Sequence, residues 1–284
     1  MDITEIESWD VRYANEQLRR LPNGAELYVE TYGSGDVPIT IVTNFFVAGV
    51  AWRNFTTTLA KEHTIVTYDL RNQGASSRGD GATDEHAKDL GFLLDDLGLE
   101  STYILASSMS TGICRDFAVE NPDRVRGLLL CGPTVNPTGN LRRKYLIRSW
   151  MKILDELGLA ALFDMFYPLV FSDGAIEQGS TAAYLALRER FLVANSVSDL
   201  GENMAGVRDA KDQAEKLRAL SCPVLLFTGD SDYITTTNAL AEAAALIRDA
   251  AVEIVPNCGH NPYVEAPDRF EELIEQYING WEAT

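Results

Sequence analysis

Basic residues are scarce in this chain of 284 residues, which carries 24 lysines and arginines against 42 aspartates and glutamates. The formal net charge is therefore -18, and the pI is near 4.5. Such an acidic surface disfavours nucleic acid and anionic membranes as partners. It also disfavours an acidic carrier protein, unless a local basic patch serves. One such patch combines Arg142, Arg143 and Lys144 with Arg148 and Lys152, and its simplest interpretation is a solvated helix face.

Long apolar runs are also missing. No stretch approaches the length of a membrane span, and residues 1–5 lack the basic and apolar parts of a secretory signal. The four cysteines show no metal-ligand spacing and lie in or beside predicted core elements, so we expect free thiols in a reducing cytoplasm. Cys258 stands close to His260 and is a candidate to line a site, although a core role is favoured.

The chain does have a regular alternation of predicted strands and helices. Apolar runs predict strands at 26–32, 39–43, 64–69, 103–107, 127–131, 224–228 and 252–255, and helical patterns predict helices at 83–97, 109–120, 236–248 and 268–280. Alternation of this kind is typical of a mainly parallel sheet with helices on both faces. The first, amphipathic strand is expected to pair at an antiparallel edge.

Residues 134–210 break this alternation, because they carry helical periodicity and many large aromatics but no convincing strand. We expect a helical cap there, inserted into an α/β core made of residues 1–133 and 211–284. Most of the cap aromatics would fill the cap's own interior. A minority, with Trp150 and Phe166 as candidates, would face the site and make its pocket apolar.

Ser108 stands where a predicted strand turns directly into a predicted helix. Its neighbours two positions away, Ala106 and Ser110, are both small. This is the pattern of a nucleophile elbow, in which a strained turn exposes the serine oxygen. The usual form is Gly-x-Ser-x-Gly, and the chain has Ala-x-Ser-x-Ser instead. A plain serine-rich turn fits this segment equally well.

Two distant segments favour the elbow. The strand at 224–228 leads into a loop with Asp230 and Asp232, and the strand at 252–255 leads into a loop with His260. The order serine, aspartate, histidine, each after a strand, is the order in α/β-hydrolases. The chain resembles that superfamily over almost its whole length. Residues 69–77 are similar to its Asp-x-Arg-Gly-x-Gly-x-Ser loop, and a weaker likeness is to the hydroxyacyl-hydroxyacid synthase of rhamnolipid biosynthesis.

The resemblance implies an α/β-hydrolase fold with an inserted helical cap, and a role for each residue of the motif. Ser108 would be the nucleophile and His260 the general base. Asp232, three residues after a glycine, would orient the histidine, whereas Asp230 would cap the turn. The two remaining histidines, His63 and His86, are expected at the surface.

An oxyanion would need two backbone donors. The resemblance implies the amides of Met109 and Phe45, with the Phe46 amide as the alternative. The family's glycine is replaced here by Asn44, which implies either a left-handed asparagine or a reshaped loop. We expect the Phe46 ring to narrow the pocket, and Tyr233, next to Asp232, is a further pocket candidate.

Three functions are consistent with these residues. The first is a serine hydrolase that cleaves an ester or thioester of an apolar acyl group through an acyl-enzyme, without cofactor or metal; CoA and carrier-protein thioesters are among its candidate substrates. The second is an acyltransferase that uses the same triad to pass a (hydroxy)acyl group to an alcohol. The third is a lyase, a carbon–carbon bond hydrolase or a non-catalytic binding protein on the same fold. The presence of all three triad residues favours an enzyme.

Overall fold

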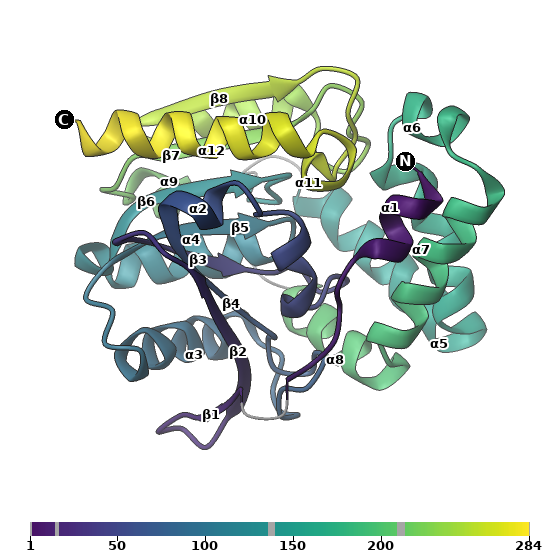
Figure 1. The fold of residues 1–284 in the computed structure, drawn as a ribbon, viewed down its shortest axis with the longest axis horizontal. Coiled ribbons are helices and arrows are strands. Elements are labelled where there is room, and N and C mark those ends of the chain that lie inside the picture. The colour runs from purple at the N-terminus through teal and green to yellow at the C-terminus, as the bar shows by residue number, and fades with distance from the viewer. Residues whose placement is uncertain (1, 15–16, 136–139, 209–213, 284) are drawn as a thin grey trace.

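One eight-stranded sheet forms the centre of the molecule (Figure 1), in a computed structural model that describes residues 2–14, 17–135, 140–208 and 214–283. The strands are ordered β1-β2-β4-β3-β5-β6-β7-β8. Their bounds are β1 Leu18–Arg20, β2 Glu26–Gly33, β3 Val37–Val42, β4 His63–Tyr68, β5 Thr102–Ser107, β6 Val125–Cys131, β7 Val224–Gly229 and β8 Ala250–Val255. The predicted mainly parallel sheet is confirmed.

The antiparallel end of the sheet differs in one respect from the prediction. β2 pairs antiparallel with β4, as expected, but β1 pairs with the other side of β2 and forms the edge. β1 has only three residues and no buried side chain. A strand that short carries too little pattern to be recognised in a sequence.

The central strands are apolar on both faces because helices cover both faces. Along β5 the side chains alternate between two hydrophobic cores, with Ile104 in one and Leu105 in the other. Leu226 and Phe227 of β7 divide in the same way. A register shift by one residue would exchange the two faces, so burial on both faces fixes the register. The register in turn fixes which residues lie at the ends of the strands.

Helices fill both layers around the sheet (Figure 1), and those predicted from the sequence at 83–97, 109–120, 236–248 and 268–280 all have a counterpart. The helix from 236 is shorter than predicted and ends at Ala244. The helices outside residues 140–208 are α1 Ile3–Ser8, η1 Gly49–Asn54, α2 Leu59–Glu62, α3 Thr83–Asp96, α4 Ser110–Glu120, η2 Pro122–Arg124, α9 Ala214–Arg218, α10 Thr237–Ala244, α11 Pro262–Glu265 and α12 Pro267–Glu282.

The segment 140–208 between β6 and β7 is mainly helical, and it lies together at one end of the sheet (Figure 1). Its helices are α5 Asn140–Val170, α6 Asp173–Gln178, α7 Thr181–Ala194 and α8 Val197–Arg208. α5 bends at Gly158, whose φ of 83° is left-handed. The division of the chain into core and cap at residues 134 and 210 stays a prediction. Within the described ranges, no helix combines the length and the apolar character needed to cross a membrane.

Two histidines are buried, which contradicts their expected surface positions. His63 is 3% exposed, and its Nε2 lies 2.7 Å from Glu275 Oε2 on α12. His86 on α3 is fully buried, and its ring lies 6.0 Å from that of Phe45. The polar start of α3 suggested solvent, but the chain after β3 packs over this position.

The buried His86 should make the fold sensitive to acid. Burial lowers its pKa to about 4, although Asp89 nearby acts in the opposite direction and Arg71 in the same. The unfolded chain therefore takes up this proton below about pH 6.5, while the folded chain resists it down to about pH 4. The stability is present above pH 6.5 and is lost as the pH falls through this window.

We predict that the wild type loses roughly 3 kcal/mol more unfolding free energy between pH 7 and pH 4 than His86→Leu does. Urea unfolding at a series of pH values measures this difference. Equal pH dependence in the two proteins would contradict it.

Candidate active site

Three side chains from the ends of three strands meet at one edge of the sheet. Ser108 follows β5, Asp232 follows β7 and His260 follows β8. The Ser108 Oγ lies 2.9 Å from His260 Nε2, and His260 Nδ1 lies 2.7 Å from Asp232 Oδ2. All three residues are at most 7% exposed. The structure thus brings the three predicted residues together in one hydrogen-bonded row.

The turn at Ser108 is strained, since its φ of 54° lies in the left-handed region that residues other than glycine rarely adopt. The Ser108 amide donates to the carbonyl of Cys131 over 2.8 Å, which continues the ladder of β5 and β6. Where the family has glycine, the Ser110 hydroxyl hydrogen-bonds the carbonyl of Val42 over 2.8 Å and accepts from the Ser107 amide over 3.1 Å. A serine therefore fits this crowded position and supports the turn.

The two aspartates of the loop after β7 have different surroundings. Asp232 Oδ1 accepts from the amides of Ile234 and Thr235 over 2.7 and 2.9 Å, and Oδ2 accepts from the Thr228 hydroxyl as well as facing His260. Asp230 is exposed, and its carboxylate accepts from the amide of Asn257 over 3.0 Å. That bond lowers the pKa of Asp230. Asp232 is the one in contact with the histidine.

The His260 loop is held by residues that gave no sign in the sequence. Its backbone amide donates 2.9 Å to the carbonyl of Val170, at the end of α5. Glu265 accepts from the amides of Gly259 and Ser172 over 2.9 and 3.0 Å, so one carboxylate connects the loop to the chain after α5. Burial raises the pKa of Glu265. The helices between β6 and β7 therefore help to position the histidine.

Gly132, directly after β6, is a second residue that sequence reasoning missed. Its φ is 55°, and a Cβ at this position would lie 2.6 Å from His260 Cε1. The ring of His260 thus packs directly against a backbone without a side chain. A glycine directly after an apolar strand can be recognised in the sequence. The reason for it cannot, because it depends on His260, which lies 128 positions away in the chain.

The backbone amides expected as oxyanion donors differ in their hydrogen bonds. Within the described part of the chain, neither the Phe45 nor the Met109 amide has a hydrogen-bond partner. The Phe46 amide does have one, because Asn44 Oδ1 accepts from it over 2.8 Å and from the Val47 amide over 3.0 Å. Asn44 is not left-handed, so the first of the two expectations for this loop is wrong and the loop is reshaped by the asparagine side chain.

Two cavities adjoin Ser108. The larger, of about 460 Å³, is mainly apolar and is also lined by His260, Phe46 and Phe166. The smaller, of about 310 Å³, has both apolar and polar side chains in its wall, and the polar ones include Arg142, Thr236 and Asn238. Trp150 lines both. Ser108 is therefore open to two cavities, of which the smaller carries charged and polar side chains.

The predicted pocket residues are divided by this arrangement. Phe46 and Phe166 line the apolar cavity, with their ring centroids 4.9 Å apart, and Trp150 lies 6.0 Å from Phe46. Tyr233 lines neither cavity and is 46% exposed, so the structure places it away from the pocket. Its carbonyl accepts from Arg142 over 2.8 Å. Adjacency to Asp232 misled the prediction, because the chain turns outward there.

The cysteines take no part in the hydrogen-bonded row. All four are free and buried, and Cys258 is fully buried without lining either cavity. The described residues contain no group of three or more histidine, cysteine or acidic side chains that could hold a metal ion. The arrangement that is present can accept a proton from a serine hydroxyl through an imidazole oriented by a carboxylate.

Comparisons with known proteins identify the fold family. A family model described as the alpha/beta hydrolase fold matches residues 38–267. The chain is 27% identical over 272 residues to 2-hydroxy-6-oxononadienedioate/2-hydroxy-6-oxononatrienedioate hydrolase 2 of Pseudomonas putida, covering 91% of this chain and 89% of that protein. It is 24% identical over 269 residues to the pimeloyl-acyl-carrier-protein methyl ester esterase of Nitrosospira multiformis, covering 88% and 97%.

Among solved structures, an esterase from Thermogutta terrifontis with malate bound superposes with a TM-score of 0.84 at 24% identity, covering 93% of this chain and 99% of that one. The sheet, its flanking helices and the matched model define the class: the chain belongs to the α/β hydrolase fold family. The relatives named here are hydrolases and esterases.

The contact between Gly132 and His260 gives a test of the site geometry. We predict that Gly132→Ala displaces the His260 ring and lowers the rate at which a fluorophosphonate probe labels Ser108 by at least about 100-fold, because misplacements near 1 Å have such effects. Intact-protein mass spectrometry follows the labelling.

Gly98→Ala is the matched control. Gly98 has a similar φ of 67°, but a Cβ there would meet nothing within 4 Å. Both variants pay the same left-handed backbone cost of about 1–2 kcal/mol. Similar labelling rates in the two variants would refute the proposed effect of the contact.

Proposed function

We propose that this protein is a serine hydrolase that cleaves an ester or thioester of an apolar acyl group through an acyl-enzyme. The observation that carries this proposal is the 2.9 Å contact between Ser108 Oγ and His260 Nε2 beside an apolar cavity. A hydroxyl in that position can lose its proton to the imidazole as it attacks a carbonyl carbon held in the cavity.

The proposed reaction has two halves. The Ser108 Oγ bonds to the acyl carbon while His260 Nε2 takes the hydroxyl proton, and the tetrahedral intermediate then collapses. The bond to the alcohol or thiol breaks, and His260 returns the proton to this leaving group. A water molecule next attacks the acyl-Ser108, again giving a proton to His260. The acid is released as that proton returns to the Ser108 Oγ.

Three further groups support this chemistry. The Asp232 carboxylate, 2.7 Å from His260 Nδ1, would hold the imidazole in the required tautomer and stabilise its cation. Two further bonds from the amides of Ile234 and Thr235 fix that carboxylate. The amides of Phe45 and Met109, which have no partner among the described residues, are the proposed oxyanion donors.

The shape and lining of the apolar cavity favour an apolar acyl group. Its volume of about 460 Å³ lies within the usual range of small-molecule sites, and aromatic rings such as Phe46, Phe166 and Phe191 form much of its wall. The names of two similar proteins, an esterase and a methyl ester esterase, agree with ester cleavage. The four unpaired cysteines favour the cytoplasm as the compartment.

Substitutions of the serine, the histidine and the two aspartates test the roles proposed for them. We predict that Ser108→Ala and His260→Ala each lower kcat/KM for a p-nitrophenyl ester by about 10⁵-fold or more. Asp232→Asn should lower it by about 10⁴-fold, because the amide favours the wrong tautomer. Asp230→Asn, the matched control, should lower kcat/KM less than about tenfold, since the Asp230 carboxylate accepts from the Asn257 amide and the Ser231 hydroxyl and does not contact His260. A larger loss for Asp230→Asn than for Asp232→Asn would exchange their roles.

Acyl transfer to a hydroxy acid is the second candidate, and the arginines in the wall of the smaller cavity are the observation that favours it. Arg142 and Arg143 line this cavity together with Ser108, while Glu242 contributes one opposing charge. A carboxylate on the acceptor, or phosphates on a CoA or carrier-protein leaving group, would be attracted by the two arginines. The sequence likeness to the hydroxyacyl-hydroxyacid synthase stays a prediction, and an experiment with two acceptor alcohols tests it.

For this second candidate we predict that a 3-hydroxy fatty acid, added during turnover of an octanoyl ester, diverts more than half of the octanoyl group into a new ester. The matched 2-alkanol, which lacks the carboxylate, should divert less by about tenfold. Arg142→Gln should reduce the difference between the two acceptors. Liquid chromatography with mass spectrometry measures the products, and free octanoate alone under all conditions would leave hydrolysis as the function.

A further inference from the structure

The N-terminal segment, residues 2–14, contributes to the apolar cavity at the candidate site. Trp9, Val11 and Tyr13 line the same space as Ser108 and His260. These three residues belong neither to the central sheet nor to the helices between β6 and β7. In Figure 1 the segment runs from α1, beside α7, towards the sheet.

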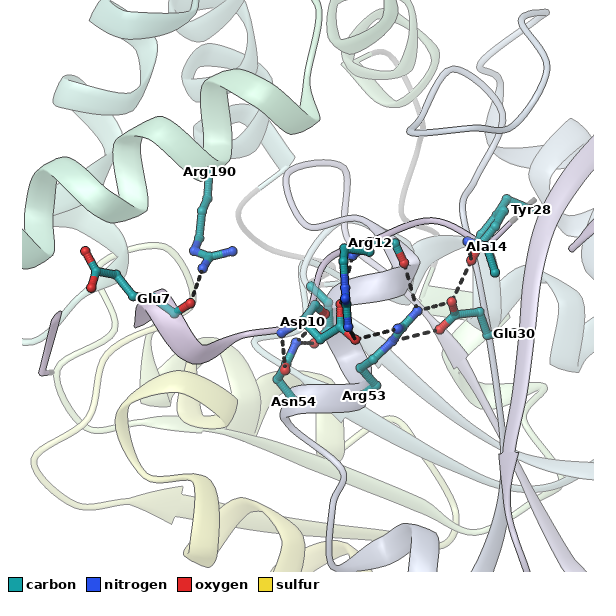
Figure 2. Close-up of polar contacts among 10 residues, drawn as sticks. Glu7, Asp10, Arg12, Ala14, Tyr28, Glu30, Arg53, Asn54 and Arg190 are labelled. Atoms are coloured by element: carbon teal, nitrogen blue, oxygen red, sulfur yellow. Dashed lines mark hydrogen bonds and ion pairs between the residues drawn. The ribbon is translucent and has the colours of Figure 1, made fainter. Parts of the chain in front are cut away.

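One end of the segment is anchored to the core through Asp10 (Figure 2). The Asp10 amide donates to Asn54 Oδ1 over 2.9 Å, and Asn54 Nδ2 donates back to the Asp10 carbonyl over 3.0 Å. The carboxylate of Asp10 accepts from Arg53 over 3.2 Å and from the Arg12 side chain over 2.9 Å. These arginines lower the pKa of Asp10, which keeps its carboxylate charged.

This anchor continues into the sheet. Arg53 pairs with Glu30 of β2, which is only 7% exposed, and it also donates to the carbonyl of Arg12 over 3.3 Å. The Tyr28 hydroxyl donates to Glu30 over 2.6 Å and accepts from the Ala14 amide over 3.0 Å. Glu30 is buried and Arg53 is partly buried, and a pair of this kind with several bonds holds its geometry better than an exposed one, so this part of the segment is fixed.

The other end of the segment is attached to α7. α1 packs against α7, and the Ile6 side chain is fully buried. Arg190 of α7 donates to the carbonyl of Glu7 over 3.2 Å, as Figure 2 shows, and its guanidinium lies 5.8 Å from the centre of the Trp9 ring. Arg190 itself lines the apolar cavity. The segment therefore connects the sheet to a helix on the other side of the cavity.

The Trp9 ring lies at the centre of this connection. It meets the Phe55 ring edge to face, with centroids 5.1 Å apart, and it is partly buried. Phe55 and Trp9 both line the cavity. Contacts on both sides, with Phe55 of the core and Arg190 of α7, hold the indole in one position.

We infer that the N-terminal segment is a fixed wall of the acyl cavity and that Trp9 is a specificity-determining residue, which limits the length of the acyl chain. This inference rests on the proposed function, because the acyl group must enter the cavity from Ser108. An acyl chain that reaches the indole must displace it or bend away, whereas a short chain ends before it. Each methylene that gains a buried position adds about 0.8 kcal/mol to binding, which is a factor of about four.

The test compares p-nitrophenyl esters from acetyl to dodecanoyl. Trp9→Ala should raise the ratio of kcat/KM for dodecanoyl to that for acetyl by at least about fivefold. Trp281→Ala is the matched control, since Trp281 is a partly buried tryptophan that stacks on Tyr103 and lines neither cavity. An equal fall for every ester in Trp9→Ala, or the same shift in Trp281→Ala, would overturn the inference.

A second variant protects the test against misfolding of the first. Asn54→Ala removes both bonds to the Asp10 backbone without removing the indole. It should move the chain-length preference in the same direction as Trp9→Ala, by a smaller factor. An unchanged preference in Asn54→Ala, with Trp9→Ala unfolded, would count against a fixed wall.

A binding measurement separates this inference from the proposed function. Isothermal titration of 1-alkanols from butanol to dodecanol requires no turnover, and Trp9→Ala should favour the longer alkanols relative to wild type. If the wild type cleaves no ester but this shift occurs, the proposed function fails and the wall remains. If esters are cleaved but the alkanol profile does not change, the wall is refuted and the proposed function stands.

Discussion

Backbone hydrogen bonds that run on beyond the strand ends hold the site together. The Ser108 amide donates to Cys131, the Gly132 amide donates to Phe227 and the Gly229 amide donates to Gly259, each over 2.8 to 3.1 Å. The turn at Ser108 is thus joined to the end of β6, the residue after β6 to β7, and the end of β7 to the loop of His260. Because β5, β6 and β7 are buried on both faces, their register cannot shift without exposing a core. The positions of serine, aspartate and histidine follow from this ladder, and the 2.9 and 2.7 Å contacts between their side chains depend on it.

The site also depends on two residues in the left-handed region. Ser108 is strained there because it carries a side chain, and the bonds from its own amide to Cys131 and from the Thr111 amide to its carbonyl hold the turn. Gly132 adopts a similar conformation without a side chain, and the imidazole of His260 occupies the space next to its Cα. Strain of this kind persists only where the surroundings fix it from several directions. Here the neighbouring strands fix the turn, at the place where the chemistry is proposed.

The space around Ser108 is made by parts of the chain that are distant in sequence. The apolar cavity takes its walls from the loop after β3, from the helices between β6 and β7, and from the N-terminal segment. The smaller cavity takes much of its wall from the start of α5 and the start of α10, and Trp150 is shared by the two cavities. Under the proposed function, substrate selection would depend on how these peripheral parts pack, while the three residues at the sheet edge would provide the same chemistry for whichever group is bound.

The sequence by itself determined the sheet, its flanking helices and the residues that meet at its edge, because apolar runs and their breaks are local signals and the ends of parallel strands converge. Local signals also located Ser108, Asp232 and His260. Only the tertiary structure decided which surfaces meet: that His86 is buried, that Tyr233 lies outside the cavities, that Asn44 bonds its own loop, and that the N-terminal segment reaches the site. These features depend on contacts between residues far apart in the chain, and no periodicity within one segment records what will pack against it.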